Sequence, residues 1–101
     1  MVQVDWAQPA LDDLHEIYEF IAHDSPRYAQ STIERITDAA ARLAHFPQLG
    51  QILTEYPHLT YRQCVVGAYR LLYREDTQHN RVIMMGVIHG SRDLPAVLAG
   101  R

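Results

Sequence analysis

Arg81-Val-Ile-Met-Met-Gly-Val-Ile-His-Gly-Ser-Arg-Asp-Leu-Pro95 is the stretch of this sequence that decides the fold. Residues 82–88 are apolar apart from one glycine, and such a short run without alternation predicts a strand buried on both faces, central in its sheet. His89 and Arg92 follow where this strand reaches solvent, and rigid strand ends often hold functional side chains. Both are therefore candidate functional residues. The alternative is that they are ordinary strand-end groups that pair with Asp93.

The length and composition predict one globular domain over residues 1–101. Apolar residues make up 48% of the chain and charged residues 21%, which is ordinary for a soluble protein. No apolar run is long enough for a membrane span, and the first ten residues lack a signal-peptide pattern. Cys64 is the one cysteine and suits a reducing compartment. We expect a cytoplasmic protein that does not bind membranes.

The charges are segregated along the chain. Residues 1–58 hold nine acidic residues and three arginines, whereas residues 59–101 hold six arginines and three acidic residues. The formal net charge is −3 and the chain has no lysine. This balance argues against indiscriminate nucleic-acid binding and excludes chemistry that needs a lysine amine. Arginine favours bidentate recognition of anions.

Patterning along the chain predicts an α+β fold. Residues 2–6 alternate as a strand does, and a helix that begins near Pro9 carries an apolar stripe up to Ile21. After a break at residues 23–26, a second helix is expected from Pro26 to about His45, with a core stripe at Ala29, Ile33, Ile36, Ala40 and Leu43. Residues 51–59 are expected to form a surface loop.

Three strands are predicted in the second half, at residues 61–66, 68–75 and 81–89, because these runs are rich in β-branched and aromatic residues. Consecutive strands joined by short turns make an antiparallel meander. The predicted fold is therefore an N-terminal strand, a two-helix antiparallel hairpin and a three-strand antiparallel meander, with both helices packed on one face of the sheet.

Most familiar catalytic and metal-binding patterns are missing. The six histidines show no pair with metal-ligand spacing, and no glycine-rich phosphate loop or nucleophile elbow occurs. The sequence predicts no metal and no cofactor. The one notable cluster is a set of basic residues on or beside the predicted meander: Arg62, Arg70, Arg74, His89 and Arg92.

This basic set has two interpretations. Alternation places Arg70 and Arg74 on one sheet face, where arginines could bind phosphate and stabilise charge during RNA cleavage, with His89 as acid or base. Alternatively, each arginine pairs with a nearby carboxylate such as Glu75 or Asp76. Spacing alone does not separate these interpretations.

Several local motifs follow one another along nearly the whole chain. They are Asp13-Leu14 with residues 17–22, Ser25-Pro26, residues 43–50, a strand set at Arg62, Val65, Val66, Gly67, Tyr69, Arg70, Leu72 and Tyr73, and the run from Val87 to Asp93. Together they resemble the RelE/ParE superfamily of toxins from type II toxin–antitoxin modules. The last motif, with Phe46-Pro47 and Leu49-Gly50, points to the ParE branch.

The resemblance implies a cognate antitoxin, with a DNA-binding N-terminal part, whose C-terminal segment wraps over the toxin. For the ParE branch it implies inhibition of DNA gyrase, and for the RelE branch ribosome-dependent mRNA cleavage. Gln51 stands where the family commonly has arginine after Gly50, so the sequence also allows an attenuated toxin that only binds its antitoxin. An acidic, lysine-free chain is attracted weakly to polyanions, which favours gyrase inhibition over RNA cleavage.

The candidate residues fall into two groups. If the chain is a ribonuclease, the expected catalytic residues are Arg62, Arg70, His89 and Arg92. The candidates for binding the target or the antitoxin are Leu11, Ile17, Ile21, Leu43, Leu49, Arg62, Arg70, Arg74 and Arg92. We expect no direct sequence-specific binding of nucleic acid.

Overall fold

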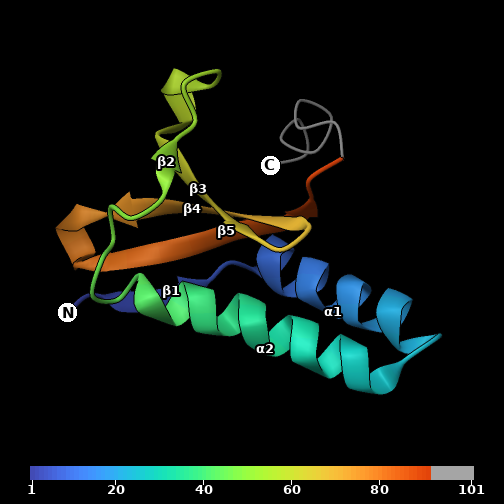
Figure 1. Ribbon diagram of the computed structural model, residues 1–101. Helices are drawn as coiled ribbons and strands as arrows, with labels where there is room; N and C mark the ends of the chain where they lie inside the picture. The colour runs from blue at the N-terminus through green and yellow to red at the C-terminus, as the bar shows by residue number, and fades with distance from the viewer. Residues whose placement is uncertain (92–101) are drawn as a thin grey trace.

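A five-stranded mixed sheet with two helices on one face makes up residues 1–91, the part of the chain that this computed structural model describes (Figure 1). The elements are β1 (Gln3–Trp6), α1 (Gln8–Ala22), α2 (Pro26–Arg42), β2 (Gln51–Ile52), η1 (Pro57–Leu59), β3 (Tyr61–Val66), β4 (Tyr69–Asp76), η2 (Thr77–His79) and β5 (Arg81–His89). The predicted α+β class and the order of strand, helix hairpin and meander are confirmed.

Strand β5 has the interior place that its apolar sequence predicts. It pairs in parallel with β1 on one side and antiparallel with β4 on the other. Because the strand order is β1-β5-β4-β3-β2, however, β4 rather than β5 is the middle strand. The prediction of a buried strand is therefore confirmed, and its central place is corrected by one position.

A bulge interrupts the pairing of β4 and β5. Leu72 lies opposite Gly86 whereas Tyr73 lies opposite Met84, so Met85 is an extra residue on β5. As a result Met84 and Val87, three residues apart, both face the core beneath the helices. The strand is thereby bent, and its alternation changes phase at Met85.

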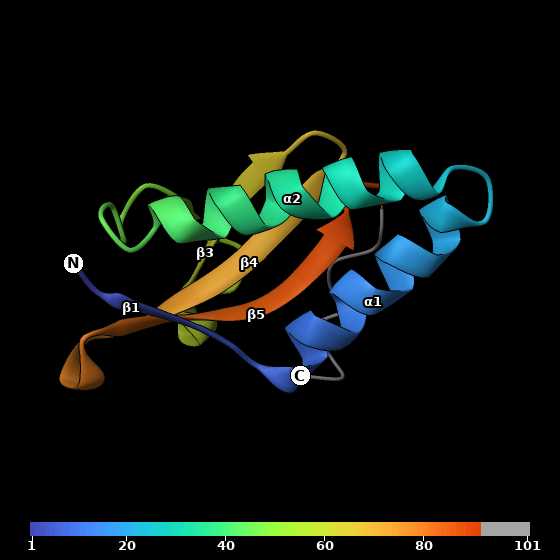
Figure 2. The ribbon, with the colours of Figure 1, turned by 90° about the horizontal axis from the view of Figure 1, so that it is seen from below.

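The two helices cover one face of the sheet, α2 on the side of β3 and β4 and α1 beside β5 (Figure 2). Ser25 caps α2, since its hydroxyl accepts a hydrogen bond from the Tyr28 N–H at 3.2 Å. Helix α2 ends at Arg42, three residues before the predicted His45. Tight turn bonds such as His45 N–H to the Arg42 carbonyl replace the helix there, and Pro47 follows closely.

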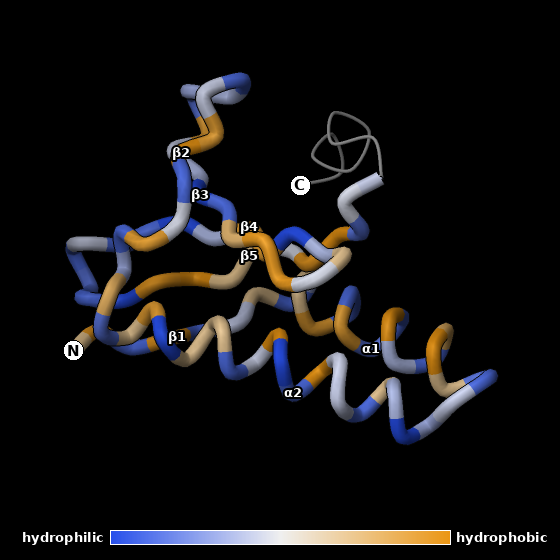
Figure 3. The backbone as a smooth tube through the Cα atoms, in the orientation of Figure 1, coloured by the Kyte–Doolittle hydropathy of each residue, from blue (hydrophilic) through white to orange (hydrophobic). Residues whose placement is uncertain are grey.

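Apolar and polar residues alternate along α2 (Figure 3). The buried side chains on this helix are Ala29, Thr32, Ile36, Ala39 and Ala40. Ile33, expected in the core stripe, is only half-buried. The stripe is therefore turned slightly from the predicted one, and its small residues let the helix lie close to the strands.

The other face of the sheet is partly covered by a segment that was expected to be a loop. Residues 51–59 contain the short strand β2 and the helical turn η1, which project from the rest of the sheet (Figure 1). Leu53 in this segment is fully buried and packs with Tyr61, Leu72 and Ile88 in a second apolar cluster. A single buried leucine forms no periodic pattern. The sequence-based prediction of a surface loop therefore missed β2 and η1.

The Tyr73 hydroxyl links the two halves of the chain. It accepts a hydrogen bond from the Gly50 N–H at 2.8 Å and donates one to the Pro47 carbonyl, also at 2.8 Å. Burial raises the pKa of Tyr73 above its usual value, so the hydroxyl keeps its proton. A Cβ atom on Gly50 would lie 2.7 Å from the Tyr73 ring, which explains why glycine suits this position.

The Tyr73→Phe variant tests this link. It leaves the Gly50 N–H and the Pro47 carbonyl without their partner, so we expect a loss of about 1–3 kcal/mol in the free energy of unfolding, measured in urea. The matched control is Tyr18→Phe, since Tyr18 is 40% exposed; we expect a change within about 0.5 kcal/mol. Equal stability of the two variants would contradict the role of the Tyr73 hydroxyl.

Candidate functional site

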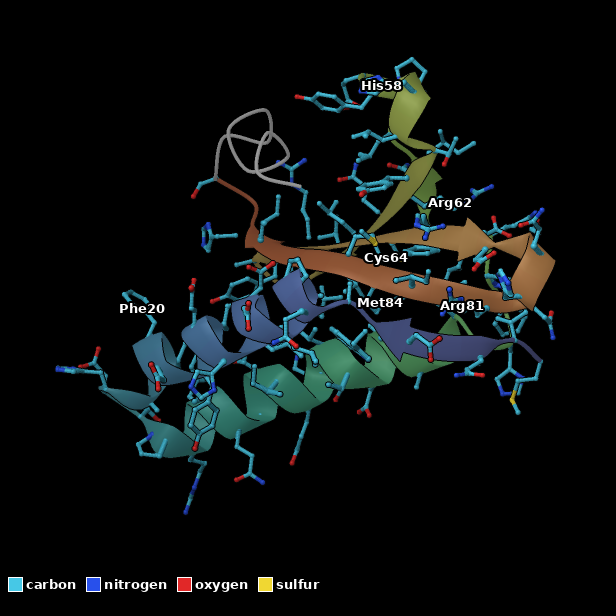
Figure 4. All side chains as sticks on the ribbon, turned by 180° about the vertical axis from the view of Figure 1, so that it is seen from behind. Phe20, His58, Arg62, Cys64, Arg81 and Met84 are labelled. Atoms are coloured by element: carbon cyan, nitrogen blue, oxygen red, sulfur yellow. The ribbon has the colours of Figure 1, made fainter. Side chains whose placement is uncertain are left out.

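Arg62 is held by contacts within the fold. Its Nε atom lies 3.2 Å from Glu75 Oε1, and its Nη1 atom donates to the Gly50 carbonyl at 2.9 Å. Both charged side chains are about four-fifths buried. Arg62 is therefore paired with a carboxylate (Figure 4), and this ion pair joins β3 to β4. The bond to Gly50 connects both strands to the chain that enters β2.

Arg70 and Arg74 lack such partners. Arg70 Nη1 donates to the neutral Gln63 Oε1 at 3.4 Å, and the buried Arg70 Nε has no hydrogen-bond partner among residues 1–91. Within residues 1–91, neither arginine takes part in an ion pair. Their positive charges therefore remain available to an anion.

A second arginine that joins carboxylates is Arg81, which was not among the candidate residues. It contacts Asp5 at 3.0 Å and Asp76 at 2.8 Å, and His79 lies 2.9 Å from Asp76 (Figure 4). Hydrogen bonds from Gln3 and then Arg81 lower the pKa of Asp5, and that from Arg81, ahead of that from His79, lowers the pKa of Asp76. This cluster joins β1 to β5 and to the turn after β4.

His89 lies at the end of β5 beside α1. Its ring meets the Tyr69 ring edge-on, with centroids 5.5 Å apart. Its Nδ1 atom lies 2.6 Å from Ser91 Oγ and 3.2 Å from the Ser91 N–H, so the ring also holds the turn that follows the strand. Together with Ile17 and Phe20 of α1, His89 lines a groove of about 580 Å³.

The residues proposed for RNA cleavage do not meet at one point. Arg62 lies across from Tyr73 and Arg70 across from Val65; because Arg62 and Val65 are three residues apart, the two arginines lie on opposite faces. His89 pairs with Tyr69, four residues from Tyr73, which is about 13 Å along the strand. Arg92 is outside the described residues. The structure thus separates Arg62, Arg70 and His89.

The apolar candidates differ in accessibility. Leu43 is fully buried and belongs to the main core, so it cannot offer a surface to a partner; this corrects the sequence-based choice. Leu11 and Leu49 are 43% and 60% exposed. Ile17 and Ile21 are half-buried.

Several exposed apolar residues were not among the candidates, and two of them are Phe20 and Val65. Phe20 is 81% exposed and points away from α1 (Figure 4), and Val65 of β3 is 72% exposed. Phe20 lies outside the apolar stripe of its helix, and this position in the sequence indicates an exposed side chain. The exposure of Val65 depends on β3 lacking a neighbouring strand at that point, and no local pattern reveals this.

A second groove, of about 420 Å³, lies between α2 and β3. Its lining includes Ala39, Arg42, Leu49, Cys64 and Val65. Burial raises the pKa of the Cys64 thiol, an effect that the charge of Arg42 opposes less strongly. The thiol is therefore protonated at neutral pH and a poor nucleophile. The groove is suited to binding rather than to covalent chemistry.

Within residues 1–91, no cluster of three or more histidine, cysteine, aspartate or glutamate side chains could hold a metal ion. The same part of the chain has no helix with the length and apolar character needed to cross a membrane.

Comparison with known proteins gives concordant results. Residues 4–94 match the family model described as the ParE toxin of the type II toxin–antitoxin system parDE. Toxin RelE2 of Caulobacter vibrioides is 39% identical over 66 residues, which are 65% of this chain and 70% of that protein.

Two solved structures share the fold. The chain resembles one in the RelBE2 toxin–antitoxin complex of Mycobacterium tuberculosis, with a TM-score of 0.64 and 27% identity over 87% of this chain and 96% of that one. It also resembles a chain of the chromosomal ParDE system of P. aeruginosa, with a TM-score of 0.73 and 17% identity over 88% and 96%. At the latter identity the likeness concerns the fold alone.

The carboxylates around Arg81 predict a pH dependence. Because the pKa values of Asp5 and Asp76 are lower in the folded chain, their contribution to stability is complete above the unfolded value of about 3.9 and is lost as the pH falls through the lowered values. When the pH falls from 6 to 2.5, we expect the free energy of unfolding, measured in urea, to decrease less for Asp76→Asn than for the wild type. Asp38→Asn is the control and should keep the wild-type pH dependence. Identical curves for Asp76→Asn and wild type would refute the assignment.

Proposed function

Because this chain belongs to the ParE toxin family of type II toxin–antitoxin systems, we propose that it arrests growth by inhibiting DNA gyrase and that a cognate antitoxin neutralises it. The observation that supports the choice of target is the separation of Arg62, Arg70 and His89, which leaves these three groups, within residues 1–91, without a common centre for RNA cleavage. We expect this chain to bind gyrase and the antitoxin in the cytoplasm.

The distribution of charge supports the same choice. The chain has a net charge of −3 and no lysine, and two of its arginines, Arg62 and Arg81, are occupied by carboxylates. Affinity for RNA rises with the number of phosphates that a protein neutralises. The net negative charge therefore disfavours the RNA of a ribosome as a target, whereas inhibition of a protein target does not require neutralised phosphates.

RNA cleavage is the second candidate function. It is favoured by the relative named Toxin RelE2 and by the exposed ring of His89 next to Ser91. In that mechanism His89 would act as acid or base, and the charged transition state would have to be stabilised without Arg70, which lies on the other face of the sheet. The third candidate is an attenuated toxin, to which Gln51 beside Gly50 points, because a basic contact common in the family is then missing.

The proposed partner is an antitoxin with a DNA-binding N-terminal part. A toxin–antitoxin complex is among the solved structures similar to this chain, and the grooves beside α1 and α2 are partly apolar and open to solvent. Disordered segments that fold on binding can fill such grooves over a large surface.

Expression of the chain without its antitoxin tests toxicity and target together. We expect growth arrest, filamentous cells and a DNA-damage response, and inhibition of supercoiling when the purified protein is added to gyrase. His89→Ala should leave supercoiling inhibition within about threefold of the wild type, because a gyrase inhibitor needs no proton transfer.

The alternatives give different results. Cleavage of translated mRNA at the ribosomal A site, abolished by His89→Ala, would replace gyrase with the ribosome as target. Normal growth at high expression, together with antitoxin binding, would identify an attenuated toxin. Unaffected supercoiling in either case rejects the gyrase proposal.

A further inference from the structure

We propose that the groove beside α1 binds an arginine or lysine side chain on a basic surface of DNA gyrase, with Glu16 as the ion partner and Phe20 as an apolar anchor next to it. The inference rests on the proposed function, because the partner is the target named there. It is carried by the shape of the groove, by an exposed aromatic ring and by carboxylates that no arginine neutralises within residues 1–91.

The groove lies between α1 and the end of β5. Its volume is about 580 Å³, which is large enough for a long side chain and the residues next to it. The wall from α1 consists of residues three or four positions apart, which share one side of the helix: Asp13, Glu16, Ile17 and Phe20. The opposite wall comes from β4 and β5 and includes Tyr69, Val87 and His89.

Phe20 is the most exposed side chain of this groove that is also strongly apolar. It is 81% exposed and points away from α1 (Figure 4), and it also lines a neighbouring hollow of about 550 Å³. Aromatic residues are enriched in the cores of protein interfaces, and the face of an aromatic ring attracts a cation. The Phe20 ring can therefore hold both the methylene stem and the charged end of a basic side chain.

Negative charge surrounds this ring. The groove and the neighbouring hollow are lined by four carboxylates and, among residues 1–91, by no arginine. The carboxylates belong to Asp13, Glu16, Glu19 and Asp24. Glu16 lines both spaces and forms no ion pair within residues 1–91. It lies one helical turn from Phe20, about 6 Å between the Cβ atoms, so a cation on the ring can pair with its carboxylate.

The other ionisable side chains of the groove already have partners in the fold. Asp13 accepts a hydrogen bond from the Val87 N–H at 2.9 Å. His89 Nδ1 lies 2.6 Å from Ser91 Oγ, and its ring packs against Tyr69. We therefore assign the direct ion pair to Glu16, and the small effect expected above for His89→Ala agrees with this assignment.

The charge of the groove decides the class of partner. Carboxylates repel phosphate groups, so a nucleic acid does not fit here. Two copies of this chain that met groove to groove would bring Glu16 toward Glu16, and like charges oppose such an assembly. An enzyme that acts on DNA must neutralise phosphates with lysine and arginine. Its surface therefore offers the side chains that this groove can accept.

The Glu16→Arg variant tests the ion pair. We expect binding to purified gyrase, measured by calorimetry, to weaken about tenfold or more and to depend less on sodium chloride. The matched control is Glu34→Arg, because Glu34 is exposed on α2 and lines neither the groove nor the neighbouring hollow. The control should stay within about threefold of the wild type. Equal affinities of the two variants would overturn the assignment of Glu16.

The Phe20→Ala variant tests the anchor. We expect about tenfold or greater loss of affinity for gyrase, whereas the urea midpoint of unfolding should not change, because this ring is largely exposed. Phe46→Ala is the matched control, since Phe46 is 64% exposed and lies outside both spaces. Wild-type affinity of Phe20→Ala for gyrase would contradict the anchor.

A supercoiling assay separates the failure of this inference from that of the proposed function. We expect the wild type to inhibit gyrase, and Glu16→Arg and Phe20→Ala to need about tenfold more protein for the same inhibition. If the wild type neither binds nor inhibits gyrase, the proposed function fails and this inference fails with it. If both variants inhibit as the wild type does, only this inference fails. Loss of antitoxin binding in variants that still inhibit would assign the groove to the antitoxin and overturn it as well.

Discussion

The buried hydroxyl of Tyr73 is the constraint on which much of the structure depends. It satisfies the Pro47 carbonyl and the Gly50 N–H, two backbone groups that would otherwise be buried without partners at a high cost in free energy. In doing so it fixes the path from α2 into β2. The same path places Gly50 within reach of Arg62. A side chain at position 50 would force the tyrosine ring to move, because its Cβ atom would lie 2.7 Å from that ring.

The arginines divide into two kinds, and the division gives the molecule its recognition properties. Arg62 and Arg81 hold strands together through carboxylates and are neutralised by them. Arg42 and Arg70 remain without ion pairs within residues 1–91 and border exposed apolar surface at the edge of β3. An overall acidic protein thus presents a locally basic edge beside exposed apolar surface.

Sequence patterns predicted the elements whose signals are long and local. Strands β3 and β5 have the predicted bounds, because their β-branched runs end at clear turns. Strand β2 was missed because two residues carry no periodicity and a distant tyrosine holds them in place. The candidate site was harder to predict. Alternation assigns Arg70 to a face, but only the register between strands shows that Arg62 lies on the other face and that, within residues 1–91, no strand pairs with the outer side of Val65.

The bulge at Met85 gives β5 one residue more than its pairing with β4 requires. Ahead of the bulge, β5 is bordered by β1; beyond it, the Val87 N–H donates to the Asp13 carboxylate of α1 at 2.9 Å. Strand β5 is thus flanked by β1 along its first half and by α1 along its second half. Deleting Met85 would join Met84 to Gly86 opposite Tyr73 and Leu72, so the ladder would become regular and Val87 would still face the core. Homologous chains should therefore tolerate the loss of residue 85 far more readily than the loss of a paired residue of this strand, which would turn every later side chain to the other face.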